Sequence, residues 1–389
     1  MSPKDPHSSS GRRRRETLLQ TTDTPVSRRL LLVAGVLLLG AGLLLPLFQK
    51  ETRKETATAD AVLRAENLHE TLAQDAEINP PEPTEFDRLV AGIDLSAAPQ
   101  PAPERLDHPE FDVVQGVTLD YLTWFFEAVG YTAEQIEQGE AVVVPPVVAL
   151  SIQPGWADGI SVPLKKSVFY RAVLPLVLLE NEAVLNDRER LESYRRKRLN
   201  RAPISPAEHE DARSLAVRYG VLPADSQASL EPGDLEELLR RVDTVPPSLA
   251  LGQAAYESGY GTSRFATTGN ALFGQWAWDD SALRPENQRE SLGSYGVRAF
   301  DSPIESVRAY LFNLNTHRVY EDFRRQRERQ RAGKPGPIEF DGLALAGTLQ
   351  EYSERRQAYV DDLQGIMRFN GLDRADGLRL VPGDPVYFE

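Results

Sequence analysis

The hydrophobic and polar positions of this chain divide it into one long apolar run, a polar stretch and a series of amphipathic segments. Residues 30–48 form a run of 19 residues without a charge. Apolar residues then recur at helical spacing in 119–130 and in 165–199, where Pro175 predicts a kink or a break. Between these segments, 141–152 is rich in β-branched residues and contains two adjacent prolines, a pattern that favours extended structure.

The second half of the chain predicts mainly helices around one glycine- and aromatic-rich insertion. A helical pattern covers 234–242, with Asp234 as the expected N-cap. Another covers 302–317, where Ser302 and Glu305 predict a capping box. The remaining predicted elements are a helix at 356–371, a small sheet within 271–300 and a weakly alternating tail at 372–389. The fold class is therefore predicted as mostly α, of the α+β type, with a small β-rich insertion.

The apolar run 30–48 has the length of a membrane-spanning helix. At a rise of about 1.5 Å per residue it spans roughly 28 Å, close to the thickness of a bilayer core. Seven Lys or Arg residues precede the run and three follow it closely, which predicts a cytoplasmic N-terminus and an external remainder. A cleaved signal peptide is the alternative, but the nearest small-x-small sites, 57–59 and 59–61, lie about ten residues too far along. We therefore expect a single-pass anchor.

Composition shifts suggest further boundaries along the chain. The N-terminal residues are polar and basic, and the stretch behind the apolar run is acidic and contains six prolines. The predicted parts are a basic cytoplasmic tail (1–29), a transmembrane anchor (30–48), an acidic proline-containing tether (49–108), a helical part (109–243), a second folded part (244–372) and a C-terminal tail (373–389).

Charge and residue usage exclude several classes of function. The formal net charge of −14 argues against general affinity for nucleic acid. The chain has no cysteine, so it has neither disulfides, nor cysteine nucleophiles, nor thiolate metal ligands. Its five histidines show no spacing typical of a metal site. We expect neither a metal nor a cofactor.

Glu257 stands alone near the end of a predicted helix that begins near Ser248 and stops at Gly259. The C-terminal end of a helix carries partial negative charge, and aromatic neighbours such as Phe273 and Trp276 would desolvate the carboxyl group. Both effects raise its pKa. A carboxyl group that stays protonated near neutral pH can protonate a leaving oxygen, as glycosidic cleavage requires. A solvated and inert Glu at a helix end is the alternative interpretation.

The segments around this acid carry a recognisable pattern. Residues 257–265 read ESGYGTSRF, and residues 270–274 read NALFG. This pattern resembles the peptidoglycan glucosaminidases of glycoside hydrolase family 73, and more closely the Bax-type glucosaminidase proteins of bacteria. Further co-linear segments extend the resemblance over roughly residues 140–372, leaving out the anchor, the tether and the tail.

The resemblance implies a lysozyme-like hydrolase that cuts the β-1,4 bond after N-acetylglucosamine in peptidoglycan. It makes 244–372 a glucosaminidase domain. Together with the anchor predicted from the apolar run 30–48, we expect this domain in the periplasm, held at the bacterial inner membrane. Glu257 matches the family's general acid. Tyr352 resembles the tyrosine of the family's Gly-Tyr-Ala-Thr-Asp segment, which helps to position substrate, although Glu351 replaces the small residue before it. The substrate-binding residues expected from the same match are Tyr260, Asn270, Phe273 and Trp276.

The sequence leaves the identity of the second catalytic group open between several carboxylates and the substrate itself. An inverting glycosidase needs a base roughly 6.5–9.5 Å from the acid to activate water. The resemblance places this base in the insertion, where Glu290 is the expected residue and Glu286 the next candidate, followed by Asp279 and Asp280. Alternatively, the acetamido group of the substrate acts as the nucleophile, and no second protein carboxylate is needed.

Two other functions remain open beside the glucosaminidase. A lytic transglycosylase also uses a single Glu at a helix end, but the NALFG segment and the region of Tyr352 favour the glucosaminidase. The third is a non-catalytic scaffold that holds glycan strands. Ser258 lacks the His and Asp arrangement of a serine hydrolase. The Arg-rich stretch 324–334 could contact anionic stem peptides, although a solvated helix face is the simpler interpretation. The expected partners are peptidoglycan strands and the inner membrane, and the sequence leaves protein partners open.

Overall fold

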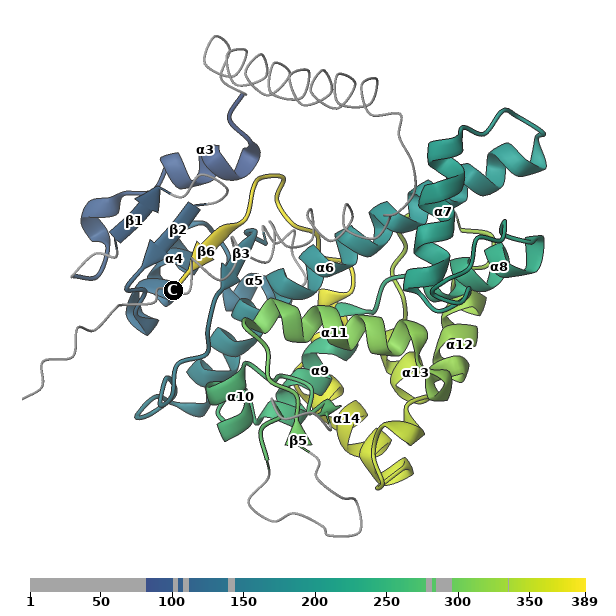
Figure 1. Cartoon of the computed structure of the whole chain (residues 1–389). Coiled ribbons are helices and arrows are strands. Elements are labelled where there is room, and N and C mark those ends of the chain that lie inside the picture. The colour runs from purple at the N-terminus through teal and green to yellow at the C-terminus, as the bar shows by residue number, and fades with distance from the viewer. Residues whose placement is uncertain are drawn as a thin grey trace, which may run out of the picture. The chain divides into compact units, whose positions relative to one another are not determined.

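The longest helix of the protein is α6 (Val162–Leu199), which has 38 residues (Figure 1). Ser161 caps its start, because the side-chain oxygen accepts a hydrogen bond from the backbone N–H of Leu164. The helix is unbroken at Pro175, which lies buried in the core, so the predicted break does not occur. Tight packing around Pro175 stabilises the helix although this residue donates no backbone hydrogen bond.

The computed structural model describes residues 82–100, 104–107, 112–138, 144–277, 282–284, 296–334 and 336–389. The predicted anchor 30–48 and the basic tail 1–29 lie outside these residues. Within the described part of the chain, no helix is long and apolar enough to cross a membrane. The described residues belong to one unit that begins at Glu82, so the predicted boundary between 243 and 244 runs through its interior.

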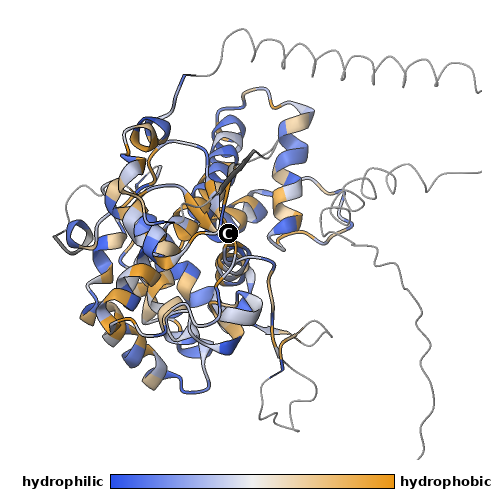
Figure 2. Ribbon diagram, turned by 90° about the vertical axis from the view of Figure 1, so that its left-hand side faces the viewer, coloured by the Kyte–Doolittle hydropathy of each residue, from blue (hydrophilic) through white to orange (hydrophobic). Residues whose placement is uncertain are grey.

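Two hydrophobic cores lie along α6. The first half of the helix contributes residues such as Phe169 and Leu176 to the larger core. The second half contributes Leu191 and Tyr194 to a smaller core, which it shares with α7 (Pro206–Arg218) and α8 (Pro232–Arg241). In Figure 1, α7 and α8 gather at one end of α6, and Figure 2 shows polar residues on the outer faces of the helices. One helix thus joins both cores.

The central helix of the larger core is α9 (Pro247–Ser258), and ten of its twelve residues are buried. It packs against α6, α13 and α14. Tyr256 and Glu257 are the two residues of α9 that keep partial exposure. The other helices around the larger core are α4 (Leu119–Ala128), α5 (Ala133–Gln138), α10 (Arg264–Gly269), α11 (Pro303–Thr316), α12 (Glu321–Arg331), α13 (Gly342–Ala346) and α14 (Gln357–Phe369).

A four-stranded sheet covers one side of this core, in the order β1–β2–β6–β3 (Figure 1). Its strands are β1 (Glu104–Asp107), β2 (Asp112–Gln115), β3 (Val147–Ala149) and β6 (Val386–Phe388). β1 and β2 are antiparallel, whereas β6 lies between β2 and β3 and is parallel to both. The predicted C-terminal tail is therefore built into the fold.

The folded region also begins earlier than the sequence indicated. Residues 82–108 were assigned to the flexible tether, yet α3 (Glu85–Ala91) inserts Phe86 into the core with 1% of its surface exposed. The backbone N–H of Phe86 donates to the carbonyl of Pro382, 3.1 Å away. The tether prediction is wrong for this stretch, because a single apolar residue paired with a distant segment leaves no periodic signal.

Two predicted helix caps also differ from the structure. The N-cap of α8 is Glu231, and Asp234 lies three residues later, where its carboxylate accepts a hydrogen bond of 3.0 Å from the Glu231 N–H. Ser302 caps α11 without a side-chain hydrogen bond. Glu305 accepts instead from the N–H of Asp301, at 3.2 Å. Both acids still accept a hydrogen bond from a backbone N–H at a helix start, but Asp234 does so three residues after the N-cap and Glu305 binds the residue before the N-cap.

The predicted small sheet in the insertion is confirmed. β4 (Trp276–Ala277) pairs in antiparallel register with β5 (Gly296–Val297). Leu283 bridges to Val297 beside this pair. The helices predicted at 119–130 and 356–371 correspond to α4 and α14, and the extended segment 141–152 contains β3.

Candidate active site

The helix that carries Glu257 is fixed at its start by a residue from the far end of the chain. Asp376 accepts hydrogen bonds of 2.8 Å from both the backbone N–H and the hydroxyl of Ser248, in the first turn of α9. Gly342 packs so closely that a Cβ atom there would lie 2.0 Å from the Ser248 hydroxyl oxygen. Asp376 therefore acts as a remote N-terminal cap, and burial raises its pKa to about 7.

The segment that leads into α9 is held by a buried guanidinium group. Arg327 is fully buried and donates to the carbonyl oxygens of Asp243 and Thr244, each 2.9 Å away. The side chain of Asp243 forms a bidentate ion pair with Arg331, at 2.5 and 2.6 Å. Much of the Arg-rich stretch predicted as solvated is thus internal, because Arg324, Arg327 and Arg331 are all buried.

A tight turn ends α9 directly after the acid. Gly259 adopts the left-handed conformation with φ of 60°, which glycine reaches without a steric penalty. The hydroxyl of Ser258 is buried, donates to the carbonyl of Ala254 at 2.6 Å and accepts from the N–H of Gly261 at 2.8 Å. Both hydrogen bonds of the Ser258 hydroxyl thus stabilise the end of α9. Glu257 lies in the last helical turn before it.

The carboxyl group of Glu257 lies among tyrosine side chains. Burial raises its pKa to about 7, and a hydrogen bond from Tyr359 opposes this shift. Burial also raises the pKa of the Tyr310, Tyr320 and Tyr352 hydroxyls, and the nearby Glu257 charge adds to each of these shifts. The raised pKa leaves a large fraction of Glu257 protonated at neutral pH, as a general acid requires.

A chain of hydrogen bonds orients this carboxyl group. The Tyr310 hydroxyl donates to Oε1 of Gln253 at 2.6 Å, and Nε2 of Gln253 donates to the Tyr359 hydroxyl at 2.8 Å. Because Tyr359 accepts from Gln253, its own proton points to Glu257. Gln253 lies one helical turn before Glu257 on the same face of α9. The carboxyl oxygen next to Tyr359 accepts a hydrogen bond from this hydroxyl, so the acidic proton belongs on the other oxygen.

A second glycine leaves space beside the carboxyl group. Gly274 has φ of +59°, and a Cβ atom at this position would lie 3.2 Å from Oε2 of Glu257. Gly274 is the last residue of the NALFG segment. A side chain here would crowd the carboxyl oxygen and strain the backbone, so both the fold and the site require glycine.

Tyr352 and Phe273 build one wall of this site. The Tyr352 hydroxyl donates to the backbone carbonyl of Phe273 at 3.0 Å, and its ring stacks on that of Tyr359 at 5.6 Å. The Phe273 ring stacks on Tyr310, with centroids 3.8 Å apart, and only 1% of its surface is exposed. The structure thus brings Tyr352 to the acid, whereas the buried ring of Phe273 has no face left for a sugar.

Asn270 occupies a structural position next to this wall. It ends α10 in the left-handed conformation, with φ of 52°. Its Oδ1 accepts from the N–H of Ile152 at 3.1 Å, and its Nδ2 donates to the carbonyls of Phe300 and Asp301, both at 3.2 Å. These bonds join three segments of the chain, so the amide group of Asn270 holds the insertion in place.

The other two predicted binding residues differ in exposure. Trp276 lies on β4 with 47% of its surface exposed, which suits a platform for a sugar ring. Tyr260 is half-buried, has φ of 59°, and packs edge-on against the rings of Phe169 and Tyr170, at 5.7 and 5.8 Å. A non-glycine residue in this conformation is uncommon, and the aromatic packing holds it.

The candidates for the catalytic base, Glu290, Glu286, Asp279 and Asp280, lie outside the described residues. Among the residues that the structure describes, no cluster of three or more His, Asp or Glu side chains could hold a metal ion. The acid is therefore the only part of the predicted catalytic pair that the structure positions within the described ranges.

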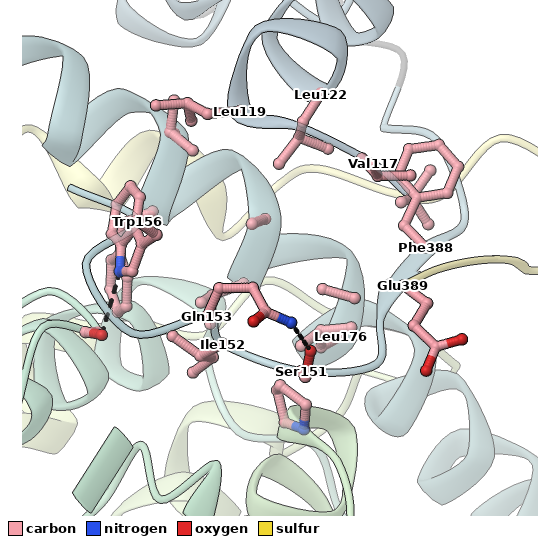
Figure 3. Close-up of a pocket in the computed structure, with 18 of the residues that line it drawn as sticks. Val117, Leu119, Leu122, Ser151, Ile152, Gln153, Trp156, Leu176, Phe388 and Glu389 are labelled. Atoms are coloured by element: carbon pink, nitrogen blue, oxygen red, sulfur yellow. Dashed lines mark hydrogen bonds between the residues drawn. The ribbon is translucent and has the colours of Figure 1, made fainter. Parts of the chain in front are cut away.

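An apolar cavity of about 340 Å³ lies apart from the acid (Figure 3). It opens between α4, α6 and the loop 151–156, and Leu119, Leu122 and Trp156 point into it. Trp156 Nε1 donates to the carbonyl of Gly261 at 3.1 Å, which ties the cavity wall to the turn after α9. Glu257 does not line this cavity, and its apolar lining does not suit a hydrated glycan.

Sequence reasoning missed two residues that contact or orient the acid, Tyr359 and Gln253. Tyr359 lies in the same segment as Tyr352, EYSERRQAYV, but only Tyr352 matched a family motif. The spacing of four residues between Gln253 and Glu257 was visible in the sequence. This spacing alone did not indicate that Gln253 helps to orient Glu257, because the link runs through Tyr310 and Tyr359, which come from two other helices.

Comparisons with known proteins cover the segments that form this site. The family model described as glucosaminidase, mannosyl-glycoprotein endo-beta-N-acetylglucosaminidase, matches residues 234–372, which include α9, the insertion and α14. The chain is 32% identical over 206 residues to "Protein bax" of Escherichia coli (strain K12), covering 53% of this chain and 70% of that protein. No solved structure matches the chain.

A protonatable glutamate in an aromatic site, within a glucosaminidase-type domain, defines a protein of the glycosidase type. The chain belongs to the Bax-type family of glucosaminidase-domain proteins. The family predicted from the ESGYGTSRF and NALFG segments is therefore confirmed.

Proposed function

We propose that the protein is a peptidoglycan hydrolase that cleaves the β-1,4 bond after N-acetylglucosamine, with Glu257 as the general acid. The observation that carries this proposal is the Glu257 carboxyl group, whose pKa burial raises to about 7 beside the Tyr359 hydroxyl. The glucosaminidase-type domain supports the choice of sugar. The family and the aromatic surroundings support a glycan substrate over other polymers.

The chemistry follows from the two protonation states of Glu257. The protonated acid transfers its proton to the glycosidic oxygen as the bond from that oxygen to C1 breaks. The hydrogen bond from Tyr359 then stabilises the carboxylate that remains. Water adds to C1, activated by a base such as Glu290 or, in the other mechanism, after the acetamido oxygen of the substrate has bonded to C1.

The product of digestion tests this proposal. We expect purified sacculi treated with the full-length protein to release fragments that end in a reducing N-acetylglucosamine, which borohydride converts to the alcohol. A lytic transglycosylase would instead leave anhydro-muramic ends, lighter by one water and resistant to reduction. Mass spectrometry before and after reduction separates the two outcomes, and anhydro ends as the main product would overturn the glucosaminidase assignment. No cleavage at all would favour the scaffold.

The anomeric form of the first product, followed by NMR, separates the two mechanisms in the same digestion. Inversion indicates a base that activates water, and the proposal then assigns this role to Glu290. Retention indicates participation of the substrate's acetamido group.

We also propose that residues 30–48 anchor the protein in the bacterial inner membrane, with the catalytic unit in the periplasm. The excess of Lys and Arg before this run supports the orientation. A protease added outside spheroplasts is expected to degrade the unit that begins at Glu82 and to spare the N-terminal tail. Protection of this unit in intact spheroplasts, with degradation after lysis, would contradict the orientation.

A further inference from the structure

A pair of lysines lies beside the turn that follows the acid. Lys165 and Lys166 belong to the first turns of α6 and are half-buried. Their Nζ atoms lie over the ring of Tyr260, at 5.7 and 5.3 Å from its centroid. Tyr260 is three residues beyond Glu257, and its φ of 59° directs the chain into this contact. Two positive charges are thus held next to the active-site turn.

An exposed aromatic side chain extends this group. Lys166 Nζ lies 4.9 Å from the ring centroid of Phe369, and it donates a hydrogen bond of 3.0 Å to Oδ1 of Asn370. Phe369 ends α14 with 82% of its surface exposed, the largest exposure among the big apolar side chains of the described ranges. We call Lys165, Lys166, Tyr260 and Phe369 the Lys–aromatic patch.

The positive charge of the patch is not neutralised locally. Neither lysine forms an ion pair within the described part of the chain, and their contacts are with ring faces and one neutral amide oxygen. The first turn of α6 contains no acidic residue. Since the N-terminal end of a helix already carries partial positive charge, two lysines there repel the helix dipole, and a bound anion would relieve this repulsion.

The patch lies within reach of a substrate that is bound at Glu257. α14 connects the two places, because Tyr359 near its start bonds to Glu257 and Phe369 is its last residue. Ten residues of helix separate them, which is about 15 Å. A glycan strand that carries peptide substituents can span this length, whereas a monosaccharide cannot.

We propose that the Lys–aromatic patch is a subsite for the carboxylate groups of the peptides attached to the glycan strand. The inference rests on the proposed function of Glu257 and adds a substrate preference to it. The two ammonium groups pair with a carboxylate, and Tyr260 and Phe369 cover the apolar part of the peptide. The protein then prefers peptide-substituted glycan over bare glycan.

The test compares two substrates and two pairs of substitutions. The variant Lys165→Gln/Lys166→Gln removes both charges of the patch. The matched control Lys197→Gln/Lys334→Gln removes two charges from positions outside the patch, one of them in the last turns of α6. The substrates are intact sacculi and sacculi stripped of their peptides by an amidase. Thermal unfolding of every variant shows whether it is folded.

On intact sacculi we expect KM to rise about tenfold in the patch variant with kcat unchanged, because ground-state and transition-state binding are lost equally. On stripped glycan the patch variant and the wild type should be alike. Lys165→Arg/Lys166→Arg keeps the charges and should restore the low KM. Equal losses on both substrates, or the same loss from the control pair, would overturn the proposal.

A binding assay keeps the test independent of catalysis. In the Glu257→Gln background, co-sedimentation with intact sacculi should weaken about tenfold on removing the two lysines, and 1 M salt should remove the difference. This result would support the subsite even if no cleavage product is ever found. Weakened binding to vesicles of anionic phospholipid, with unchanged binding to sacculi, would instead show that the patch contacts a membrane.

Discussion

Glu257→Gln is expected to lower kcat on sacculi by about 10²–10⁴-fold, because the amide keeps the shape of the side chain but cannot donate the proton. The measurement is the initial rate of fragment release by the purified full-length protein. Glu134→Gln is the matched control, since Glu134 is an exposed residue of α5. A folded Glu257→Gln protein with nearly the wild-type rate would remove Glu257 from the mechanism.

The pH dependence of stability gives this variant a second signature. The folded-state pKa of Glu257 is raised to about 7 from an ordinary value of 4.5, so the native state holds this proton more tightly than the unfolded state. The contribution of this proton to the free energy of unfolding is fully present below pH 4.5 and is lost as the pH rises through 7. The glutamine variant does not titrate, so its Tm should match or exceed that of the wild type at pH 8. A clear loss of Tm at pH 8 would show that the carboxylate is structurally required.

Tyr359→Phe is expected to lower the maximal kcat by about tenfold or more and to move the alkaline limb of the pH–rate profile to higher pH. The hydroxyl donates to Glu257 and lowers the pKa of that carboxyl group, so its removal raises the pKa further and frees the acid to rotate. Gln253 also loses the acceptor for its Nε2 group. The measurement is kcat between pH 5 and pH 9 at saturating substrate.

Tyr194→Phe is the control for this prediction, because Tyr194 is a buried tyrosine of the smaller core whose hydroxyl bonds to the exposed His209, at 2.8 Å. Its pH profile should keep the wild-type shape. If Tyr359→Phe lowers kcat without moving the alkaline limb, the hydroxyl stabilises the fold and does not tune the acid.

Elements with a strong local signal were predictable. α9 ends at Gly259 as the glycine predicted, because the left-handed cap depends on the backbone of one residue. α4 and α14 follow apolar spacing within a single segment. The position of Tyr352 next to the acid followed from the family resemblance, and the structure places its hydroxyl on the Phe273 carbonyl. The spacing between Phe273 and Tyr352 in the sequence does not by itself predict this hydrogen bond.

Predictions failed where the decisive partner lies far along the chain. Phe273 was expected to stack on sugar, but Tyr310 already covers its ring. The end of the tether was expected to be flexible and the tail 372–389 showed only weak alternation, but Phe86 and β6 complete the core and the sheet. No local pattern identifies such partners, because burial is a property of the whole packed unit.

By itself, the sequence determined the family, the candidate acid Glu257 and the helix that carries it, because these depend on neighbouring residues and their conformational preferences. Only the tertiary structure decided the pKa of this carboxyl group, which burial raises to about 7. Its pKa depends on desolvation and on Tyr359, and the start of its helix depends on Asp376, 128 residues away from Ser248. Such couplings act through space, so they exist only once α9, α11 and α14 have packed together.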